Sequence, residues 1–371
     1  MNVEKITLKN YRNYIDLELF LHPGLNIIYG DNAQGKTNFI ESIYICGIGK
    51  SHRASKEKEL INWNSHSAYI KANIKRANID TDIEVNIFDN KPKIIKVGGV
   101  KIEKISELLG NLNVVMFSPE DLRLIKEGPV YRRRFLDIEV SQIKPAYFYN
   151  LHQYNRVLLQ RNNLLKSIKY NRSQSLLKTL DIWDEQLSEF GSHIIVYRIE
   201  FIKKISMLAR LVHRKLTDGK EELNVLYSSM FKNVQTREDG KILLYKELIR
   251  SRNRDIERGM TSVGPHRDDM DFFINNTDVK TYGSQGQQRT VALSLKLSEL
   301  EFIRAECIEY PILLLDDVLS ELDIKRQKFL LENLKNVQTI LTCTGINDIR
   351  EFRKNDRFLF KVSDGLIEKI E

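Results

Sequence analysis

The residues best suited to chemistry form a glycine-rich loop near the start of the chain. From Gly30 to Thr37 the sequence fits the pattern G-x-x-x-x-G-K-[ST], whose backbone N–H groups wrap around the phosphates of a nucleotide. The apolar run before it, 25–29, predicts a buried strand. The segment after it, 38–44, predicts a helix whose N-terminus adds partial positive charge at the same place. We predict nucleotide contacts from Gly30, Asp31, Asn32, Ala33, Gln34, Gly35, Lys36, Thr37 and Asn38.

Two side chains of this loop have distinct expected tasks. Lys36 should reach the β- and γ-phosphates, and the hydroxyl of Thr37 should hold Mg²⁺. Alone, the loop indicates a nucleoside triphosphatase or a nucleotide kinase. Its alternative interpretation is a chance match on a structural turn.

A second run of the sequence ends in two adjacent carboxylates. Residues 312–315 are all apolar, as in a buried parallel strand, and Asp316 and Asp317 follow them. At the carboxyl end of such a strand, Asp316 would orient Mg²⁺ and its waters beside Thr37, and Asp317 would polarise the attacking water. Lys36, Asp316 and Asp317 are thus the predicted catalytic residues, and Thr37 and Asp316 the predicted Mg²⁺ ligands. The alternative is a strand followed by an acidic turn.

A further anion-binding element precedes a predicted helix at 288–307. The segment 282–289 contains Ser284, Gly286 and Gln287, which offer a hydroxyl and N–H groups at the start of that helix. One chain has no obvious second phosphate for it, so we expect it to serve the nucleotide of another subunit. The alternative is an ordinary helix cap with flexible glycines.

Composition indicates a globular protein of the cytosol. Of the 371 residues, 42% are hydrophobic and 29% are charged, and no apolar run near a motif is long enough to span a membrane. The N-terminus has no apolar signal region, so secretion is not expected. Cys46, Cys307 and Cys343 form no metal spacing or disulfide framework and are expected to be buried thiols. The net charge of +8 favours polyanions such as nucleic acid, although many soluble proteins are mildly basic.

The pattern of elements changes twice along the chain. Short strand-like runs dominate up to residue 117, and strands and loops return after residue 260. Between them glycine nearly disappears, since Gly191 is the only one between Gly128 and Gly219. Apolar residues at 187–212 recur every three or four positions, and another helical tract covers 147–168, which predicts long antiparallel helices. We expect this stripe to be internal packing, with partner binding as the alternative.

Several segments together give a resemblance to a known class. The stretches 32–38, 284–287 and 315–323 resemble ABC-type ATPases of the SMC/Rad50 class. More narrowly, 8–14, 117–122, 132–137 and 264–269 resemble the RecF family of bacterial recombination mediators. The resemblance implies an α/β fold: an ABC-type P-loop ATPase head from 1–117 and 260–371, with an inserted helical arm at 118–259. It implies ATP and Mg²⁺ as cofactors.

The same resemblance implies a mechanism and partners. Ser284, Gly286 and Gln287 match the ABC signature, which contacts the γ-phosphate held by the opposite protomer of an ATP-dependent homodimer. Weak, DNA-stimulated ATP hydrolysis would accompany binding of double-stranded and gapped DNA and promote recombinase loading in DNA repair. Implied protein partners are RecR, RecO and the RecA recombinase. The implied location is cytoplasmic and nucleoid-associated, without a membrane.

Two positions depart from the pattern of the class. Asp317 stands where many ABC enzymes carry glutamate, so its reach as a general base is shorter. Cys343 and Thr344 follow the predicted strand 339–342, where many of these enzymes place a histidine.

Basic clusters give the expected DNA contacts. We predict that Lys50, Arg53 and Lys56 neutralise phosphates without reading bases. The densest cluster, 132–134, has an alternative as an internal ion-pair network with Asp137 and Glu139.

Other functions share some of these features. The alternatives are the ATP-binding cassette of a membrane transporter, a nucleotide kinase and a structural DNA binder that hydrolyses nothing. The transporter shares all three nucleotide motifs, but the helical insertion, the missing histidine and the positive charge weigh against it.

Overall fold

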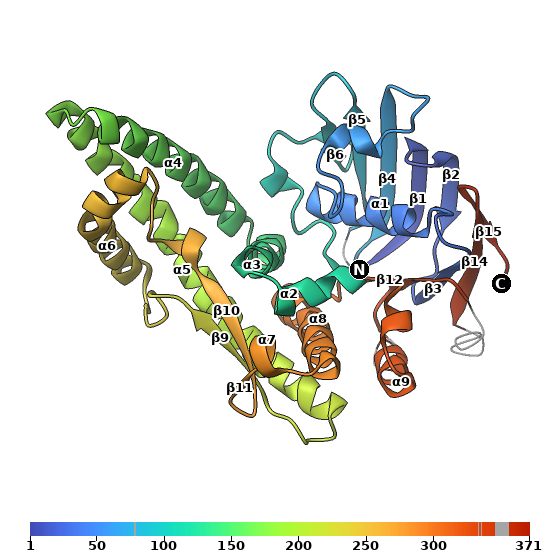
Figure 1. Ribbon diagram of the computed structural model, residues 1–371. Helices are drawn as coiled ribbons and strands as arrows, with labels where there is room; N and C mark the ends of the chain where they lie inside the picture. The colour runs from blue at the N-terminus through green and yellow to red at the C-terminus, as the bar shows by residue number, and fades with distance from the viewer. Residues whose placement is uncertain (78, 333, 335, 346–355) are drawn as a thin grey trace. The chain divides into compact units, whose positions relative to one another are not determined.

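The two ends of the chain fold together into one unit, and the middle of the chain forms a second (Figure 1). This computed structural model describes residues 1–77, 79–332, 334, 336–345 and 356–371. The first unit comprises Met1–Leu122 with Leu295–Glu371, and the second comprises Arg123–Ser294. Both contain helices and strands, which confirms the α/β class.

The phosphate loop belongs to a sheet that both ends of the chain build. Its described strands run in the order β15-β14-β3-β13-β12-β8, and all neighbours are parallel except β14 and β15. The register places Ile28, Thr342 and Asp316 in one row across β3, β13 and β12, so these three strands end at one edge. The strands are β3 (Leu25–Tyr29), β8 (Val114–Phe117), β12 (Ile312–Asp316), β13 (Thr339–Cys343), β14 (Arg357–Ser363) and β15 (Leu366–Lys369).

An antiparallel sheet forms the other layer of the first unit. Its described order is β2-β1-β4-β5-β6-β7. The strictly alternating burial along β4 shows that one face packs inward and the other faces solvent. The strands are β1 (Asn2–Tyr11), β2 (Tyr14–Phe20), β4 (Ser67–Lys75), β5 (Thr81–Phe88), β6 (Ile94–Val97) and β7 (Val100–Lys101).

Helix α1 (Lys36–Ile48) lies between these two sheets (Figure 1). It contacts β8, β12 and β13 on one side and β4 and β5 on the other. Because both sides are covered, nearly every residue from Phe39 to Ile48 is buried and the helix shows no polar face. The remaining elements of this unit are η1 (Glu57–Leu60), η2 (Ile105–Glu107), η3 (Pro119–Leu122), η5 (Val318–Glu321), α9 (Ile324–Glu332) and the second part of α8 (Gln285–Cys307).

The second unit is built from long helices and a small sheet. Helix α5 packs against α4 and α6, and the described strands run in the order β11-β10-β9 (Figure 1). At Gly191, α6 approaches closely: a Cβ would lie 2.4 Å from the side chain of Leu244, which would have to shift. The elements are α2 (Arg123–Lys126), α3 (Pro129–Ile143), α4 (Pro145–Tyr170), α5 (Gln174–Leu216), β9 (Leu223–Ser228), α6 (Arg237–Arg258), η4 (Pro265–Arg267), β10 (Asp269–Ile274), β11 (Thr277–Asp278) and α7 (Val279–Tyr282).

The boundary of the inserted unit differs from the expected one. We expected the arm to end at 259, whereas residues 260–294 also pack with it, and the boundary falls inside α8. Strand β10 pairs with β9, and Asp268 accepts hydrogen bonds from Tyr227 and Ser229. These contacts join segments about forty residues apart. A pattern within one short stretch of sequence therefore could not predict them. No helix of the described ranges is both long and apolar enough to cross a bilayer.

Buried charges fix the helices of the second unit. Arg161 of α4 donates to Asp184 of α5 at 2.6 Å and to Asp255 of α6 at 2.9 Å, and all three side chains are fully buried. Arg198 of α5 donates to Tyr147 of α4 at 2.9 Å and to the carbonyl of Pro265 at 2.6 Å. A charge can remain buried only when it is paired in this way.

A buried histidine makes the stability of this unit depend on pH. His266 lies 2.7 Å from the hydroxyl of Tyr154 through Nδ1 and 3.1 Å from the carbonyl of Thr261 through Nε2. Since a carbonyl only accepts, Nε2 carries the proton and Nδ1 accepts from Tyr154. Burial lowers the pKa of His266 from 6.5 to about 4.

We therefore expect the free energy of unfolding of the second unit to fall as the pH drops from about 6.5 to about 4. In that window the unfolded chain binds a proton that the folded unit excludes, and the full shift corresponds to about 3 kcal/mol. Denaturant titrations in a Trp63→Phe background would follow this unit through Trp183 on α5. His266→Gln should flatten this part of the pH dependence. An equal pH slope in both proteins would contradict the assignment.

Candidate functional site

The phosphate loop connects β3 to α1 and is shaped for an anion. Gly35, at the N-cap of α1, has φ of 117°, and no side chain caps the helix N-terminus there. A Cβ at Gly35 would lie 2.5 Å from the amide of Asn13, so only glycine fits. Lys36 bends back over the loop and donates from Nζ to the carbonyls of Gly30 at 2.6 Å and Asp31 at 2.7 Å. The loop therefore presents an amine and a helix N-terminus at the same point.

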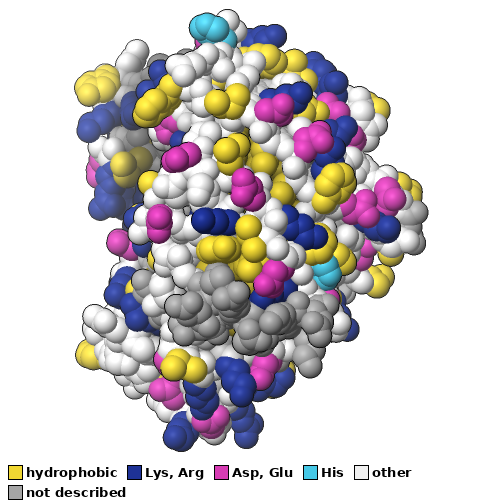
Figure 2. Space-filling view, turned by 90° about the vertical axis from the view of Figure 1, so that its right-hand side faces the viewer, with side chains coloured by type: hydrophobic (Ala, Val, Ile, Leu, Met, Phe, Trp, Pro, Cys, Tyr) yellow, Lys and Arg dark blue, Asp and Glu magenta, His cyan; other side chains and the backbone are white. Residues whose placement is uncertain are grey.

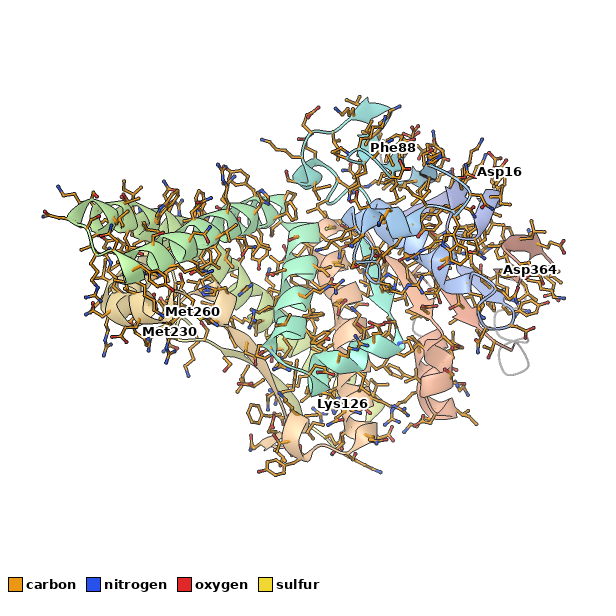
Figure 3. All side chains as sticks on the ribbon, turned by 45° about the horizontal axis from the view of Figure 1, so that its top comes forward. Asp16, Phe88, Lys126, Met230, Met260 and Asp364 are labelled. Atoms are coloured by element: carbon orange, nitrogen blue, oxygen red, sulfur yellow. The ribbon has the colours of Figure 1, made fainter. Side chains whose placement is uncertain are left out.

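Residues at the β1–β2 and β14–β15 turns form hydrogen bonds to the loop. The amide of Asn13 donates to the carbonyl of Gln34, and the hydroxyl of Tyr14 donates to the carbonyl of Gly35, each at 2.9 Å. Asp364, labelled in Figure 3, lies in the β14–β15 turn. Its N–H donates to the side chain of Gln34 at 2.6 Å. The first two contacts reach main-chain carbonyls and so hold the backbone of the loop.

The structure brings the loop and the carboxylate strand together. The hydroxyl of Thr37 donates to Oδ1 of Asp316 at 2.9 Å, and Thr342 donates to the same oxygen at 2.8 Å. Thr37 and Asp316 are 279 positions apart in the sequence. Their two oxygens form a hard donor pair of the kind that Mg²⁺ prefers, and Mg²⁺ sites commonly use few protein ligands. The residues present thus fit the predicted metal.

Asp317 occupies an unusual backbone position at the same edge. Its φ of 53° is left-handed, and its N–H donates to the hydroxyl of Thr342 at 3.0 Å. This turn directs the chain away from the strand directly after Asp316. Cys343 ends the neighbouring strand β13, and burial raises the pKa of its thiol to about 12, so it remains a neutral thiol.

A buried carboxylate next to the loop binds two arginines, and the sequence patterns did not single it out. Glu41 lies on α1 one turn after Thr37 and accepts two hydrogen bonds from Arg12, each of 3.0 Å. Arg53 donates to Glu41 at 3.3 Å and to Asn38 at 2.8 Å. Burial alone would raise the pKa of Glu41, but the hydrogen bonds from Arg12 and Ser51 and the charges of Arg12 and Arg53 outweigh it and lower the pKa to about 2.

Burial and the charge of Glu41 also change the pKa of the neighbouring phenol of Tyr11. Tyr11 donates to Glu41 at 2.9 Å, and burial together with the charge of Glu41 raises the pKa of Tyr11 well above 10. Tyr11 therefore stays neutral and remains a donor. The only sequence signal for Glu41 is its spacing of four residues from Thr37, which places both on one side of the helix.

A pocket of about 710 Å³ opens beside Asn38, the residue that follows Thr37. Arg12, Asn13, Arg53 and Trp63 also line it, and the side chain of Trp63 is fully exposed. An aromatic face, amides and guanidinium groups are together suited to a flat polar ring.

The second predicted anion element is an exposed, well-capped helix start in the second unit. Ser284 accepts from the N–H of Gln287 at 3.2 Å, while the side chain of Gln287 accepts from the N–H of Ser284 at 2.9 Å. This reciprocal pair is a capping box, which is the alternative raised from the sequence. The amide of Gln287 also donates to Glu221 at 2.8 Å. Ser284 and Gly286 remain exposed at the helix start.

The predicted DNA-contact residues lie in different surroundings. Lys50 and Lys56 are exposed, whereas Arg53 is partly neutralised by Glu41. On the face shown in Figure 2, Lys and Arg are interspersed with Asp and Glu and form no single basic patch. In the arginine run at 132–134, Arg132 pairs with Asp269 at 2.5 Å and is buried. Arg132 is therefore part of an internal ion pair, but its partner is Asp269 and not Asp137 or Glu139.

Comparison with known proteins identifies the family. Residues 2–363 match the family described as the RecF/RecN/SMC N terminal domain. The chain is 52% identical to the DNA replication and repair protein RecF of Alkaliphilus oremlandii, with 99% of this chain and 100% of that protein covered. It is 48% identical to the protein of the same name from Clostridium tetani, over 98% of this chain and 99% of the relative.

Solved structures give the same result. A structure described as the recombination mediator protein RecF-ATPrS in the RecFOR pathway matches with a TM-score of 0.93 and 38% identity, covering 100% of this chain and 98% of that one. A Smc head domain from Pyrococcus furiosus matches with a TM-score of 0.56 and 16% identity, covering 99% and 95%, which shows a shared fold alone. The chain is a member of the RecF family of ABC-type ATPases.

Proposed function

We propose that this chain binds and slowly hydrolyses ATP with Mg²⁺, dimerises when ATP is bound, and acts on DNA in recombinational repair. The observation that carries the proposal is the hydrogen bond between Thr37 and Asp316, because it joins the phosphate loop to the carboxylate strand. The RecF structures named with ATP and ATPrS support the choice of nucleotide.

The residues of the loop account for phosphate binding. Lys36 would exchange its contacts to the carbonyls of Gly30 and Asp31 for the β- and γ-phosphate oxygens. Thr37 and Asp316 would hold Mg²⁺, which supplies charge neutralisation on those phosphates when bound. Asp317 would accept the proton of the attacking water, and its side chain is one methylene shorter than glutamate, which favours slow turnover.

The pocket beside Asn38 would receive the nucleoside. It adjoins the helix turn that follows the phosphate loop, and Trp63 offers an exposed aromatic face for stacking on the base. The paired Arg12 and Glu41 would keep this wall fixed while the nucleotide enters.

ATP would join two copies of the chain. Ser284 and Gly286 are exposed at a helix start, where they would contact the γ-phosphate held by the opposite protomer. Two such composite sites would form in a two-fold dimer, and hydrolysis would release it. A nucleotide kinase needs no such second element.

Family membership and charge support a role on DNA. The net charge of +8 suits contact with a phosphate backbone, and the relatives are named for DNA replication and repair. We infer binding to duplex DNA near single-strand gaps, with Lys50, Arg53 and Lys56 among the contacts, and recombinase loading together with RecR, RecO and RecA. A protein of this kind would work in the cytoplasm at the nucleoid.

Asp317→Asn should separate nucleotide binding from hydrolysis. The amide keeps the shape of the side chain but accepts no proton, so hydrolysis should fall at least about 100-fold. ATP binding should persist, and the ATP dimer should accumulate in sedimentation experiments. Lys36→Ala is the matched control, since it removes the phosphate contact and should abolish the dimer. Normal hydrolysis by Asp317→Asn would show that another group is the base.

The role on DNA is tested by hydrolysis rates with no DNA, single-stranded DNA, duplex DNA and gapped duplex DNA. We expect slow basal turnover that duplex and gapped DNA raise by about tenfold, as expected when substrate binding stabilises the closed dimer. Lys36→Ala gives the background rate of hydrolysis, because it lacks the phosphate contact. A rate indifferent to every DNA would refute coupling to DNA while leaving the ATPase assignment intact.

A further inference from the structure

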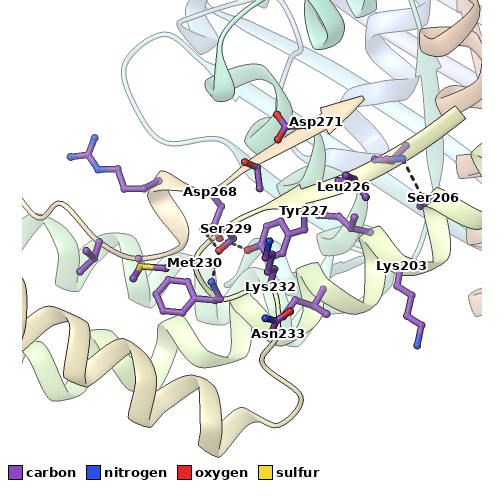
Figure 4. A pocket seen from close by; sticks show the side chains of 18 of the residues that line it. Lys203, Ser206, Leu226, Tyr227, Ser229, Met230, Lys232, Asn233, Asp268 and Asp271 are labelled. Carbon is purple, nitrogen blue, oxygen red and sulfur yellow. Dashed lines mark hydrogen bonds between the residues drawn. The ribbon is translucent and has the colours of Figure 1, made fainter. Parts of the chain in front are cut away.

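The second unit has a groove that the proposed ATPase mechanism does not use. The groove has a volume of about 930 Å³ and runs between α5 and the outer side of β9 (Figure 4). The loop after β9 closes one end, and the segment before β10 lines another part. Exposed apolar side chains at it are Met207, Leu226 and Met230, each more than half exposed. A volume of this size is in the range of real binding pockets.

The floor of the groove is the outer edge of β9, with which no other strand of the described residues pairs. In β9 the N–H of Val225 points away from β10, since it donates to the hydroxyl of Ser206 on α5 at 3.2 Å (Figure 4). The N–H of Asn275 donates to the carbonyl of Glu222. In the register of β9 and β10, this bond also means that Val225 directs its main-chain groups away from β10. Peptide groups two residues apart face the same way, so Tyr227 also directs its N–H and C=O outward.

No hydrogen bond joins these main-chain groups of Tyr227 to another described residue, and its phenol donates to Asp268. Tyr227 itself lines the groove. An open strand edge of this kind is a template for another strand.

The charges at the groove are mostly positive. Lys203, Lys232 and Arg267 line it and are exposed, and among the described residues none of the three has a carboxylate partner. Figure 4 shows Lys203 on α5 and Lys232 on the loop after β9. Of the acidic residues, Asp268 pairs with Arg198 at 3.4 Å and accepts hydrogen bonds from Tyr227 and Ser229, which leaves Asp271 as an opposing charge. The rim therefore favours an acidic occupant.

We propose that this groove binds an extended, acidic segment of a partner protein, which adds as a strand to the outer edge of β9. The main chain of the segment would pair with Tyr227, its apolar side chains would contact Met207, Leu226 and Met230, and its carboxylates would face Lys203 and Lys232. Strand addition draws affinity from main-chain hydrogen bonds and specificity from alternating side chains. This surface belongs to the second unit alone, so the proposal does not depend on ATP binding.

The test uses a capped, fluorescein-labelled decapeptide of alternating glutamate and valine, with fluorescence anisotropy as the readout on the full chain. We expect the double variant Lys203→Glu/Lys232→Glu to weaken binding by about tenfold or more, because both rim charges are reversed. Lys246→Glu is the matched control, since Lys246 is also an exposed lysine of this unit but does not line the groove. Unchanged thermal unfolding of each variant shows that the fold is intact.

Two further measurements separate strand addition from simple charge attraction. The same peptide methylated on every backbone nitrogen keeps its charges but cannot pair, and it should bind at least about tenfold more weakly. Binding of the unmodified peptide should slow hydrogen exchange at the amide of Tyr227.

The proposal is overturned if the wild-type chain does not bind the peptide or if the double variant binds it as well as Lys246→Glu does. Equal binding of the methylated peptide would also refute it. A single-stranded oligonucleotide that requires Lys203 and Lys232, where the peptide does not bind, would reassign the groove to nucleic acid.

Discussion

The hydrogen bond between Thr37 and Asp316 depends on the register of three parallel strands. Because Ile28, Thr342 and Asp316 lie in one row, the end of β3, where the phosphate loop begins, and the end of β12 meet at one edge. A shift of one residue would turn the side chain of Asp316 to the opposite face of the sheet. The central strand β13 keeps this register, and Thr342 on that strand donates to the same carboxylate. The site therefore exists only when both ends of the chain have joined one sheet.

Helix α1 connects the parallel sheet to the antiparallel sheet, because it packs against strands of both. It is covered on both sides, so its position relative to both layers is fixed by close packing. Glu41 on this helix is fully buried, and its charge is compensated by Arg12 and Arg53 together. Arg12 comes from the turn after β1, directly before Asn13, which holds the phosphate loop. The pair of Arg12 and Glu41 therefore links the antiparallel sheet to the helix that follows the 30–37 loop.

The sequence predicted the elements whose signals are local. The phosphate loop, the apolar strand before Asp316 and the helical tracts all follow from adjacent residues. The partners of Glu41 and Arg132 could not be predicted in this way, because Arg12 and Asp269 are brought to them by the tertiary fold. The pairing of β9 with β10 also joins distant segments, and it moves the boundary of the second unit past 259. The roles of Lys50 and Lys56 stay a prediction, since exposure alone does not identify a ligand.

We infer that the buried charges of the second unit set its geometry. Apolar residues of similar size in place of an ion pair such as Arg161 with Asp184 often keep or raise stability, so burial free energy alone does not explain the pair. Arg161 of α4 contacts Asp184 of α5 and Asp255 of α6 at once, which only one alignment of the three helices allows. Fixing α5 also fixes Ser206, and with it the edge of β9 that Ser206 caps. The polar interior thereby sets the spacing between α5 and the open strand edge.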